Sequence, residues 1–421
     1  MLTLVAIPFL LNRWLSQADY ASWVLGFQIA MYIPLLGFGI HQILMRTIAH
    51  GFAEQSNAVV QKAIASGFFL ICTQAFIGIA IVMISVFSLP LFLHVPIEEL
   101  ATIEAVWLRV GIAASLGLLA LFYFGSFGAI ARFEWENAYK AIIATVFIGL
   151  VFVLYLTDHL LLIYIANAYI VAIVSGLVFL SAVFIRQKSM PRPQLHRLDK
   201  PLLISFFQGM RGISVWQLSA FLVAGVDIWI IARIAFDAVP GYSLALALVT
   251  FVVGVGVAFL SPCLPRFAQE LSKPGHGQFH GVFIHYQKRL LQIMATLLVL
   301  IIFVPNTIWE QLFQEATPVF LEVFPILLMA AFIRMLTVLY SIAIVSANLQ
   351  HQVVFPPLAE GISNLIASII LGIWLGPIGV ALGTLVGAVI CFSIYSFHTI
   401  PNCATAVPVS AISLLIPRRR A

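Results

Sequence analysis

Charged residues are scarce in this chain. Asp, Glu, Lys and Arg make up 9% of its 421 residues, whereas 62% of the residues are hydrophobic. A soluble globular protein is about half apolar and about a quarter charged. With a mean hydropathy of +1.09, the chain has too little polar surface to cover its apolar side chains in water. The scarcity of charge therefore excludes a water-soluble domain and predicts an all-α, polytopic protein of the lipid bilayer.

Motifs for catalysis and for metal binding are also missing. The sequence contains no nucleotide-binding loop of the GxxxxGK[ST] type and no GxSxG nucleophile elbow. The four cysteines show no CxxC spacing, so neither a disulfide framework nor a zinc site is indicated. His276, His280 and His285 share one polar segment, where the lack of nearby cysteines favours a solvated loop over a metal site. We expect no catalytic residue, no metal and no cofactor.

Twelve hydrophobic segments are bounded by polar breaks, and a helix needs about 20 apolar residues to cross a bilayer. They run approximately over 2–16, 21–45, 62–93, 103–131, 137–157, 160–185, 202–236, 241–265, 283–308, 318–347, 353–375 and 377–400. The first lacks the basic leader and cleavage site of a signal peptide, so we expect it to be retained. The longest charged break, 186–201, predicts a cytoplasmic linker between two six-helix lobes, 1–185 and 202–400, followed by a cytoplasmic tail, 401–421.

The cations gather on one side of this predicted topology. If the N-terminus lies inside, the inner loops and the C-terminal tail hold sixteen of the 21 Lys and Arg residues. The outer loops are acidic, with only Arg13, Arg109 and Arg233 near them. Cytoplasmic loops are generally enriched in Lys and Arg. The pattern predicts that both termini are cytoplasmic, and it accounts for the net charge of +5 without a nucleic-acid partner.

One apolar segment, "LGPIGVALGTLVGAV" at 375–389, carries glycine at every fourth position: Gly379, Gly383 and Gly387. In water, glycine in a helix costs about 1 kcal/mol relative to alanine. In lipid the backbone has no water to bond, so the helix is enforced and a stripe of small residues lets a second helix approach closely. The three glycines are therefore predicted to form a helix-packing face.

Four stretches together resemble a known family. They are "GFGIHQILMRTIA", "DIWIIARIAFDAVPGYSLAL", "SPCLPRFAQEL" and "NLIASIILGIWLGPIGVALGTLVGAVI". In this order, and with twelve spans, they resemble the polysaccharide-exporter branch of the multidrug/oligosaccharidyl-lipid/polysaccharide (MOP) superfamily, which also contains the MATE transporters. The O-antigen flippases of the Wzx type are the nearest match, and the lipid II flippases, which usually have fourteen spans, are a weaker one.

The resemblance implies a flippase of the bacterial inner membrane that is not an enzyme. Such a protein moves an undecaprenyl-diphosphate-linked oligosaccharide to the outer leaflet by alternating access, for the synthesis of O-antigen, capsule or exopolysaccharide. Its expected partners are this lipid-linked substrate, membrane lipids, and the polymerase and ligase of the same pathway. We expect a monomer.

Four ionisable residues lie inside predicted spans, where insertion of a charge costs about 3 kcal/mol and usually marks function. Arg211 and Arg334 are expected at similar depth, and arginine binds phosphate bidentately, so both are candidates for holding the diphosphate. Structural pairing of Arg334 with Glu360 remains an alternative. Glu360 and Asp227 are candidates for coupling transport to a proton or sodium gradient.

Two other functions compete with the flippase. An intramembrane glycosyltransferase or polysaccharide polymerase could use the outer carboxylates Glu98, Glu99 and Glu104, although an acidic outer loop is the simpler interpretation. A drug/cation antiporter of the same superfamily would need acidic rather than basic groups in its cavity. The deep arginines favour the flippase.

Overall fold

The computed structural model describes residues 2–92, 96–187, 190–260, 263–271, 273, 278–347, 349–410 and 414–415. Contacts divide the chain into two compact units. We call Ala18–Leu218 the N-unit, and Met1–Gln17 with Ser219–Ala421 the C-unit.

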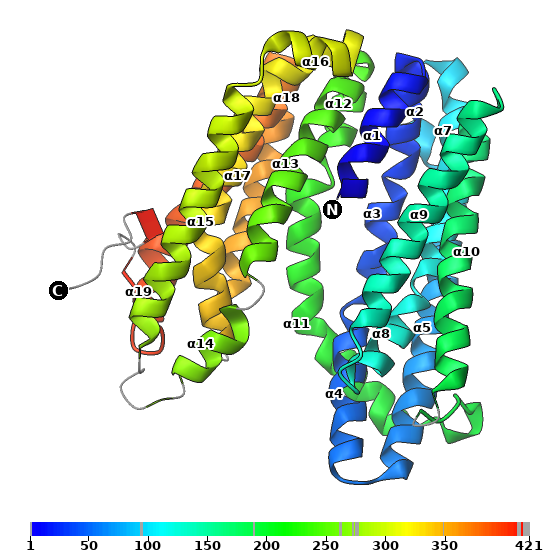
Figure 1. The fold of residues 1–421 in the computed structure, drawn as a ribbon, viewed down its shortest axis with the longest axis vertical. Coiled ribbons are helices and arrows are strands. Elements are labelled where there is room, and N and C mark those ends of the chain that lie inside the picture. Colours follow the sequence, from blue (N-terminus) through cyan, green and yellow to red (C-terminus); the bar gives the residue numbers. More distant parts are fainter. Residues whose placement is uncertain are drawn as a thin grey trace. The chain divides into compact units, whose positions relative to one another are not determined.

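The N-unit is a bundle of long apolar helices around an aromatic core (Figure 1). Phe122 is fully buried, and its ring centroid lies 5.2 Å from that of Phe68 and 5.3 Å from that of Phe184. The helices are α2 (Gln17–Phe27), α3 (Ile29–Tyr32), α4 (Ile40–Ala53), α5 (Asn57–Val86), α6 (Leu89–Phe92), α7 (Ile97–Gly117), α8 (Ala120–Gly128), α9 (Glu134–Leu156), α10 (Leu162–Arg186) and most of α11 (Lys200–Ala224), with 3₁₀ turns at Ile33–Gly37 and Leu195–Arg197.

The end of the predicted linker is fixed to the N-unit. Lys62 Nζ on α5 lies 2.7 Å from Asp199 Oδ2, and the Asp199 amide donates to Ser66 Oγ at 3.2 Å. The hydrogen bond from Lys62 holds the pKa of Asp199 below its usual range, so the ion pair is lost only when the pH falls through that lowered pKa. Residues 186–201 are thus anchored at their C-terminal end.

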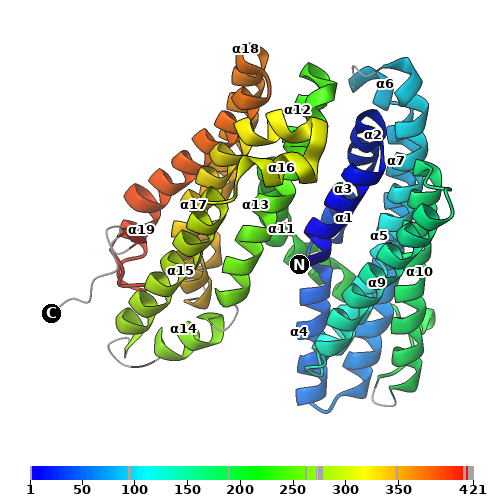
Figure 2. The same cartoon turned by 45° about the horizontal axis from the view of Figure 1, so that its top comes forward.

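The C-unit contains the remaining helices (Figure 2). They are α1 (Leu2–Trp14), α12 (Asp227–Ile234), α13 (Val239–Leu260), α14 (Cys263–Leu271), α15 (Phe279–Ile302), α16 (Asn306–Phe313), α17 (Thr317–Ser346), α18 (Phe355–Ile394) and α19 (Ile400–Asn402). Short 3₁₀ turns lie at Phe236–Ala238, Gln314–Ala316 and Gln350–Val353, and a π-helical turn lies at Tyr395–Thr399.

Helix α1 packs in the C-unit, on α13 and α16. Asn12 Nδ2 donates to the Phe313 carbonyl at 3.4 Å, and the Phe9 ring meets the Phe313 ring edge-on at 4.9 Å. The two contact units therefore do not coincide with the predicted lobes 1–185 and 202–400, because α1 joins the second unit and the division falls at 218/219 within α11. The lobes, the linker 186–201 and the tail 401–421 stay a prediction.

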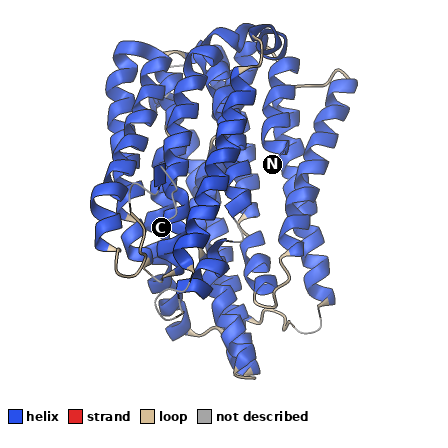
Figure 3. Cartoon of the chain, turned by 60° about the vertical axis from the view of Figure 1, so that its left-hand side comes forward, coloured by secondary structure: helices blue, strands red, loops and turns tan. Residues whose placement is uncertain are grey.

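The predicted fold class is confirmed. Among the described residues the regular elements are helices, without a strand (Figure 3). In the part of the chain that the structure describes, eight helical segments are long and apolar enough to cross a membrane. One of them, Phe355–Asn402, contains the last two predicted spans, and three more predicted spans fall on α1, on α11 with α12, and on α15. Each of the twelve predicted segments thus overlaps helix, as expected where the backbone must satisfy its own hydrogen bonds.

The two last spans form a helical hairpin within α18. At Gly376 the backbone leaves helical geometry with φ 60° and ψ −139°, a positive φ that glycine adopts without steric cost. The chain then reverses, so the hairpin has a first leg before Gly376 and a second leg after it. The predicted glycine stripe lies on the second leg and faces the first. A Cβ added at Gly379 would lie 2.0 Å from the Leu371 carbonyl oxygen, and one at Gly383 would lie 2.3 Å from Ser368 Oγ. Only glycine allows the legs to approach this closely.

Candidate functional site

The C-unit buries a carboxylate inside a cage of hydroxyl and amide groups. Asp227, the first residue of α12, is 1% exposed. Its Oδ2 accepts hydrogen bonds from Thr384 Oγ1 at 2.8 Å and from Tyr242 OH at 3.2 Å, and its Oδ1 accepts one from Asn364 Nδ2 at 3.4 Å. A carboxylate at a helix N-terminus also gains from the helix dipole. These donors replace the water that the buried group has lost.

The α18 hairpin brings these donors together. Asn364 lies on its first leg and Thr384 on its second. Between them, Ser368 Oγ is within hydrogen-bond distance of both Asn364 Oδ1, at 3.0 Å, and the Val380 carbonyl, at 3.1 Å. A Cβ at Gly387 would lie 3.0 Å from Asn364 Cβ. The cage therefore depends on the close contact between the two legs.

A second buried carboxylate lies on the same hairpin and pairs with a deep arginine. Arg334 Nε, on α17, donates to Glu360 Oε1 on the first leg of α18. The Glu360 side chain is 6% exposed and that of Arg334 is 25% exposed. Cys391, on the second leg, also hydrogen-bonds to Glu360. Arg334 is close enough to attract Asp227 electrostatically, so the two carboxylates belong to one network.

The guanidinium of Arg334 is only partly used by this pairing. Its Nη2 atom is buried and has no hydrogen-bond partner among the described residues. Buried polar atoms in proteins are nearly always satisfied, and each exception calls for an explanation such as a ligand. The free nitrogen gives the site a donor for an anion.

The structure thus brings together three of the four charged residues predicted from the sequence: Arg334, Glu360 and Asp227. The side chain of Arg211 lies outside the described part of the structure, so its predicted role stays a prediction. The roles predicted for the other three also stay predictions, although their proximity is now observed.

Sequence reasoning missed the neutral members of the network, Tyr242 and Thr384. Asn364 and Ser368 stand four residues apart, on one face of a helix, and this spacing is the signal that could have pointed to a polar face. The expectation of a solvated loop for the histidine segment is wrong for His280 and His285, which lie on α15. His276 lies outside the described residues, and no group of three or more metal-ligating side chains occurs in the part of the chain that is described.

Comparisons with known proteins identify solved structures that share this fold. No protein-family model matches the chain, and no curated protein sequence does. A MATE-family multidrug resistance transporter of the MOP superfamily, in an inward-facing conformation, matches with a TM-score of 0.80 at 12% identity, covering 97% of this chain and 96% of the other. The lipid II flippase MurJ matches at 0.66 and 16% identity, covering 95% and 91%.

A third match is the MATE transporter VcmN of Vibrio cholerae, with a TM-score of 0.65 and 16% identity over 96% of this chain and 94% of that one. At such identities the likeness is one of fold. The fold extends over nearly the whole chain in all three cases. The chain is a polytopic membrane protein with the fold of the MOP-superfamily transporters.

Proposed function

We propose that the protein is a flippase that moves an undecaprenyl-diphosphate-linked oligosaccharide across the bacterial inner membrane by alternating access, with both termini in the cytoplasm. The polysaccharide-exporter resemblance supports the substrate class. The fold, shared with a lipid II flippase and with MATE transporters, supports transport rather than enzymatic chemistry. The observation that carries the proposal is the unsatisfied guanidinium nitrogen of Arg334.

Arg334 lies deep within its helix. It follows the start of α17 by 17 residues and precedes the end by 12, or about 26 Å and 18 Å at 1.5 Å per residue. A diphosphate is the kind of ligand that an arginine fork binds through charge-assisted hydrogen bonds. Glu360 engages Nε, so Nη2 remains as a donor from which a phosphate oxygen could accept a hydrogen bond.

The two carboxylates supply a means of coupling. With Asp227 and Glu360 both ionised, the single charge of Arg334 leaves one negative charge unbalanced in an apolar unit. Uptake of a proton or a sodium ion removes that imbalance. A diphosphate that captures Arg334 would leave the Glu360 carboxylate without its partner, and a cation would then be needed to balance that buried charge.

Three variants test the assignment: Arg334→Ala, Arg334→Lys, and Arg334→Ala combined with Glu360→Ala. Removal of one partner of a buried charged pair costs about 2–5 kcal/mol, so Arg334→Ala should lose surface polysaccharide and also membrane abundance. The double variant should recover abundance, because no charge is left unpaired, but should not recover export. Lysine keeps the charge without the fork and should retain part of the activity.

The matched control is Arg233→Ala, which removes an exposed cation from the end of α12. It should leave both abundance and export unchanged. Normal export by an abundant double variant would show that Arg334 has a structural role only and would overturn the assignment.

A MATE-type cation antiporter is the second candidate, and the buried cage around Asp227 favours it, since an anionic site suits a cationic substrate. Efflux of an organic cation dye separates the two functions. If the protein is an antiporter, Asp227→Asn should stop dye efflux, whereas the double Arg334/Glu360 variant should retain it. The enzymatic alternative gains no support, because Glu99 accepts a 2.6 Å hydrogen bond from Ser22 Oγ and so serves the fold.

A further inference from the structure

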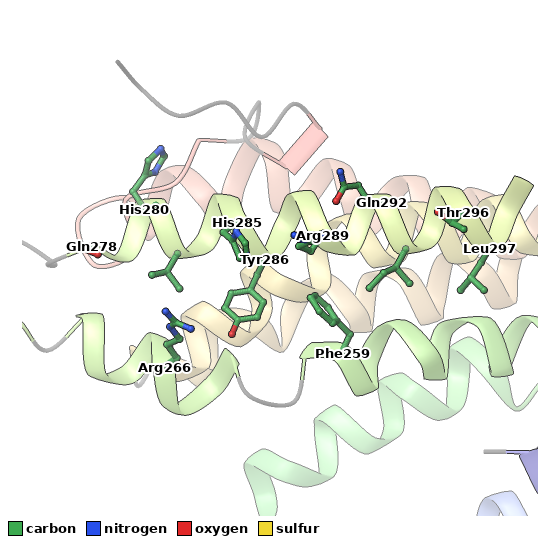
Figure 4. A pocket seen from close by; sticks show the side chains of 13 residues that line it. Phe259, Arg266, Gln278, His280, His285, Tyr286, Arg289, Gln292, Thr296 and Leu297 are labelled. Atoms are coloured by element: carbon green, nitrogen blue, oxygen red, sulfur yellow. The ribbon is translucent and has the colours of Figure 1, made fainter.

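The C-unit has a cavity of about 1150 Å³ that shares no residue with the buried charge network. It lies between α15 on one side and the α13–α14 pair on the other (Figure 4). Its volume is slightly above the roughly 300–1,000 Å³ of typical ligand pockets. Its lining changes from cationic to apolar along α15, and this gradient indicates the kind of ligand that fits.

The cationic end is formed by Arg266 on α14 and Arg289 on α15, with His285 one turn before Arg289. The guanidinium of Arg266 lies 5.9 Å from the centroid of the Tyr286 ring, and the two side chains face each other across the cavity (Figure 4). A cation over an aromatic face is held in place by the ring quadrupole.

Neither arginine forms an ion pair among the described residues. The nearest acid on α14, Glu270, attracts Arg266 but is engaged elsewhere. It lies 2.5 Å from Lys273 Nζ, and it accepts the Gln278 amide at 2.9 Å. The cationic end therefore keeps two positive charges available for an anion.

The other end of the cavity carries apolar side chains, Phe259 on α13 and Ile293 and Leu297 on α15, beside the uncharged polar residues Gln292 and Thr296. Leu297 follows Arg289 by eight residues, about 12 Å along the helix, which is close to the thickness of one leaflet's hydrocarbon, roughly 15 Å. The same helical face continues beyond the cavity to Leu300, which is 62% exposed. An apolar chain lying here would continue onto a surface suited to lipid.

We propose that this cavity binds an anionic phospholipid of the surrounding bilayer. The phosphate lies between Arg266 and Arg289, and one acyl chain lies along Phe259, Ile293 and Leu297. A soluble anion would use the cationic end only and would leave the apolar end unfilled. A zwitterionic lipid would fill the apolar end but would gain less from two unpaired arginines. The proposal does not depend on which substrate the protein transports.

The test uses the full-length purified protein and counts bound lipids by native mass spectrometry. Phosphatidylglycerol should bind at least tenfold more tightly than phosphatidylcholine with the same acyl chains. Arg266→Gln and Arg289→Gln should each weaken phosphatidylglycerol binding about fivefold, the contribution of one basic side chain near an anionic surface. Lys288→Gln is the matched control, because Lys288 is exposed on α15 but does not line the cavity.

A second arm distinguishes a lipid from a free phosphate. Leu297→Trp fills the apolar end and should reduce binding of the long-chain lipid, whereas Leu300→Trp, outside the cavity, should not. Inorganic phosphate at 10-fold excess should fail to displace the lipid. Equal binding of the two lipids, full binding by a protein that carries both Arg266→Gln and Arg289→Gln, or displacement by phosphate alone would each overturn the proposal. Unchanged elution of every variant on size exclusion confirms that the fold is intact.

Discussion

Replacement of Gly383 by alanine should separate the legs of the α18 hairpin. A Cβ at this position would lie 2.3 Å from Ser368 Oγ and 2.4 Å from the Ser368 backbone nitrogen. Ordinary contacts of a Cβ begin at 3.4 Å, so the legs must move apart by about 1 Å. The clash is with backbone, which cannot turn aside as a long side chain can. Overpacking of this kind costs about 1–3 kcal/mol, and we expect the upper end here.

A loss of about 3 kcal/mol would lower the apparent melting temperature of a unit of this size by about 6–12 °C, since each kcal/mol shifts it by about 2–4 °C. Gly387→Ala should cost less, because its nearest contacts would be at 3.0 Å. Gly149→Ala, on α9, is the control, because an added Cβ there meets nothing within 4 Å. The purified variants are heated, and unfolding is monitored as loss of the monodisperse size-exclusion peak. This gives the apparent melting temperature of each of the three variants. A Gly383→Ala protein as stable as Gly149→Ala would refute the hairpin packing.

Three other predictions concern topology and coupling. Reporter fusions after Pro193 and Arg420 should both report cytoplasm and a fusion after Glu99 should report periplasm, whereas a periplasmic signal at Pro193 would contradict the orientation. Glu360→Gln should abolish the dependence of transport on a pH gradient while downhill movement persists, because the amide cannot carry a proton. Asp227→Asn should do the same if Asp227 is the carrier, and unchanged gradient dependence in both variants would remove both residues from the coupling step.

The sequence was sufficient to predict the helices because the bilayer leaves the backbone few choices. The span predicted at 137–157 corresponds to α9, Glu134–Leu156, and the one at 160–185 corresponds to α10, Leu162–Arg186. Hydropathy does not predict where a helix breaks within a span, as between α7 and α8, since such a break depends on local packing. It also could not predict that α1 packs on α13 and α16, because hydropathy does not specify which helices are neighbours.

Only the charged residues of the candidate site could be predicted from the sequence. Arg334, Glu360 and Asp227 stood out because a charge in an apolar span is costly. Their partners Tyr242 and Thr384 are ordinary residues of transmembrane helices. They donate hydrogen bonds to Asp227 only because of the register of α18 against α12 and α13. The depth of the two residues in their spans does not say whether Arg334 pairs with Glu360. The structure shows this pair, which forms because α17 packs on α18.

Reconstitution into liposomes tests the proposed flippase function. The purified chain is placed in liposomes that contain an undecaprenyl-diphosphate-linked oligosaccharide with a labelled sugar, and the label is probed with a membrane-impermeant reagent. The inner-leaflet pool should become reactive with time in the presence of the wild-type protein, and it should stay protected with the Arg334→Ala/Glu360→Ala variant. Protection of that pool with a folded wild-type protein, at the level of protein-free liposomes, would contradict the proposed flippase function.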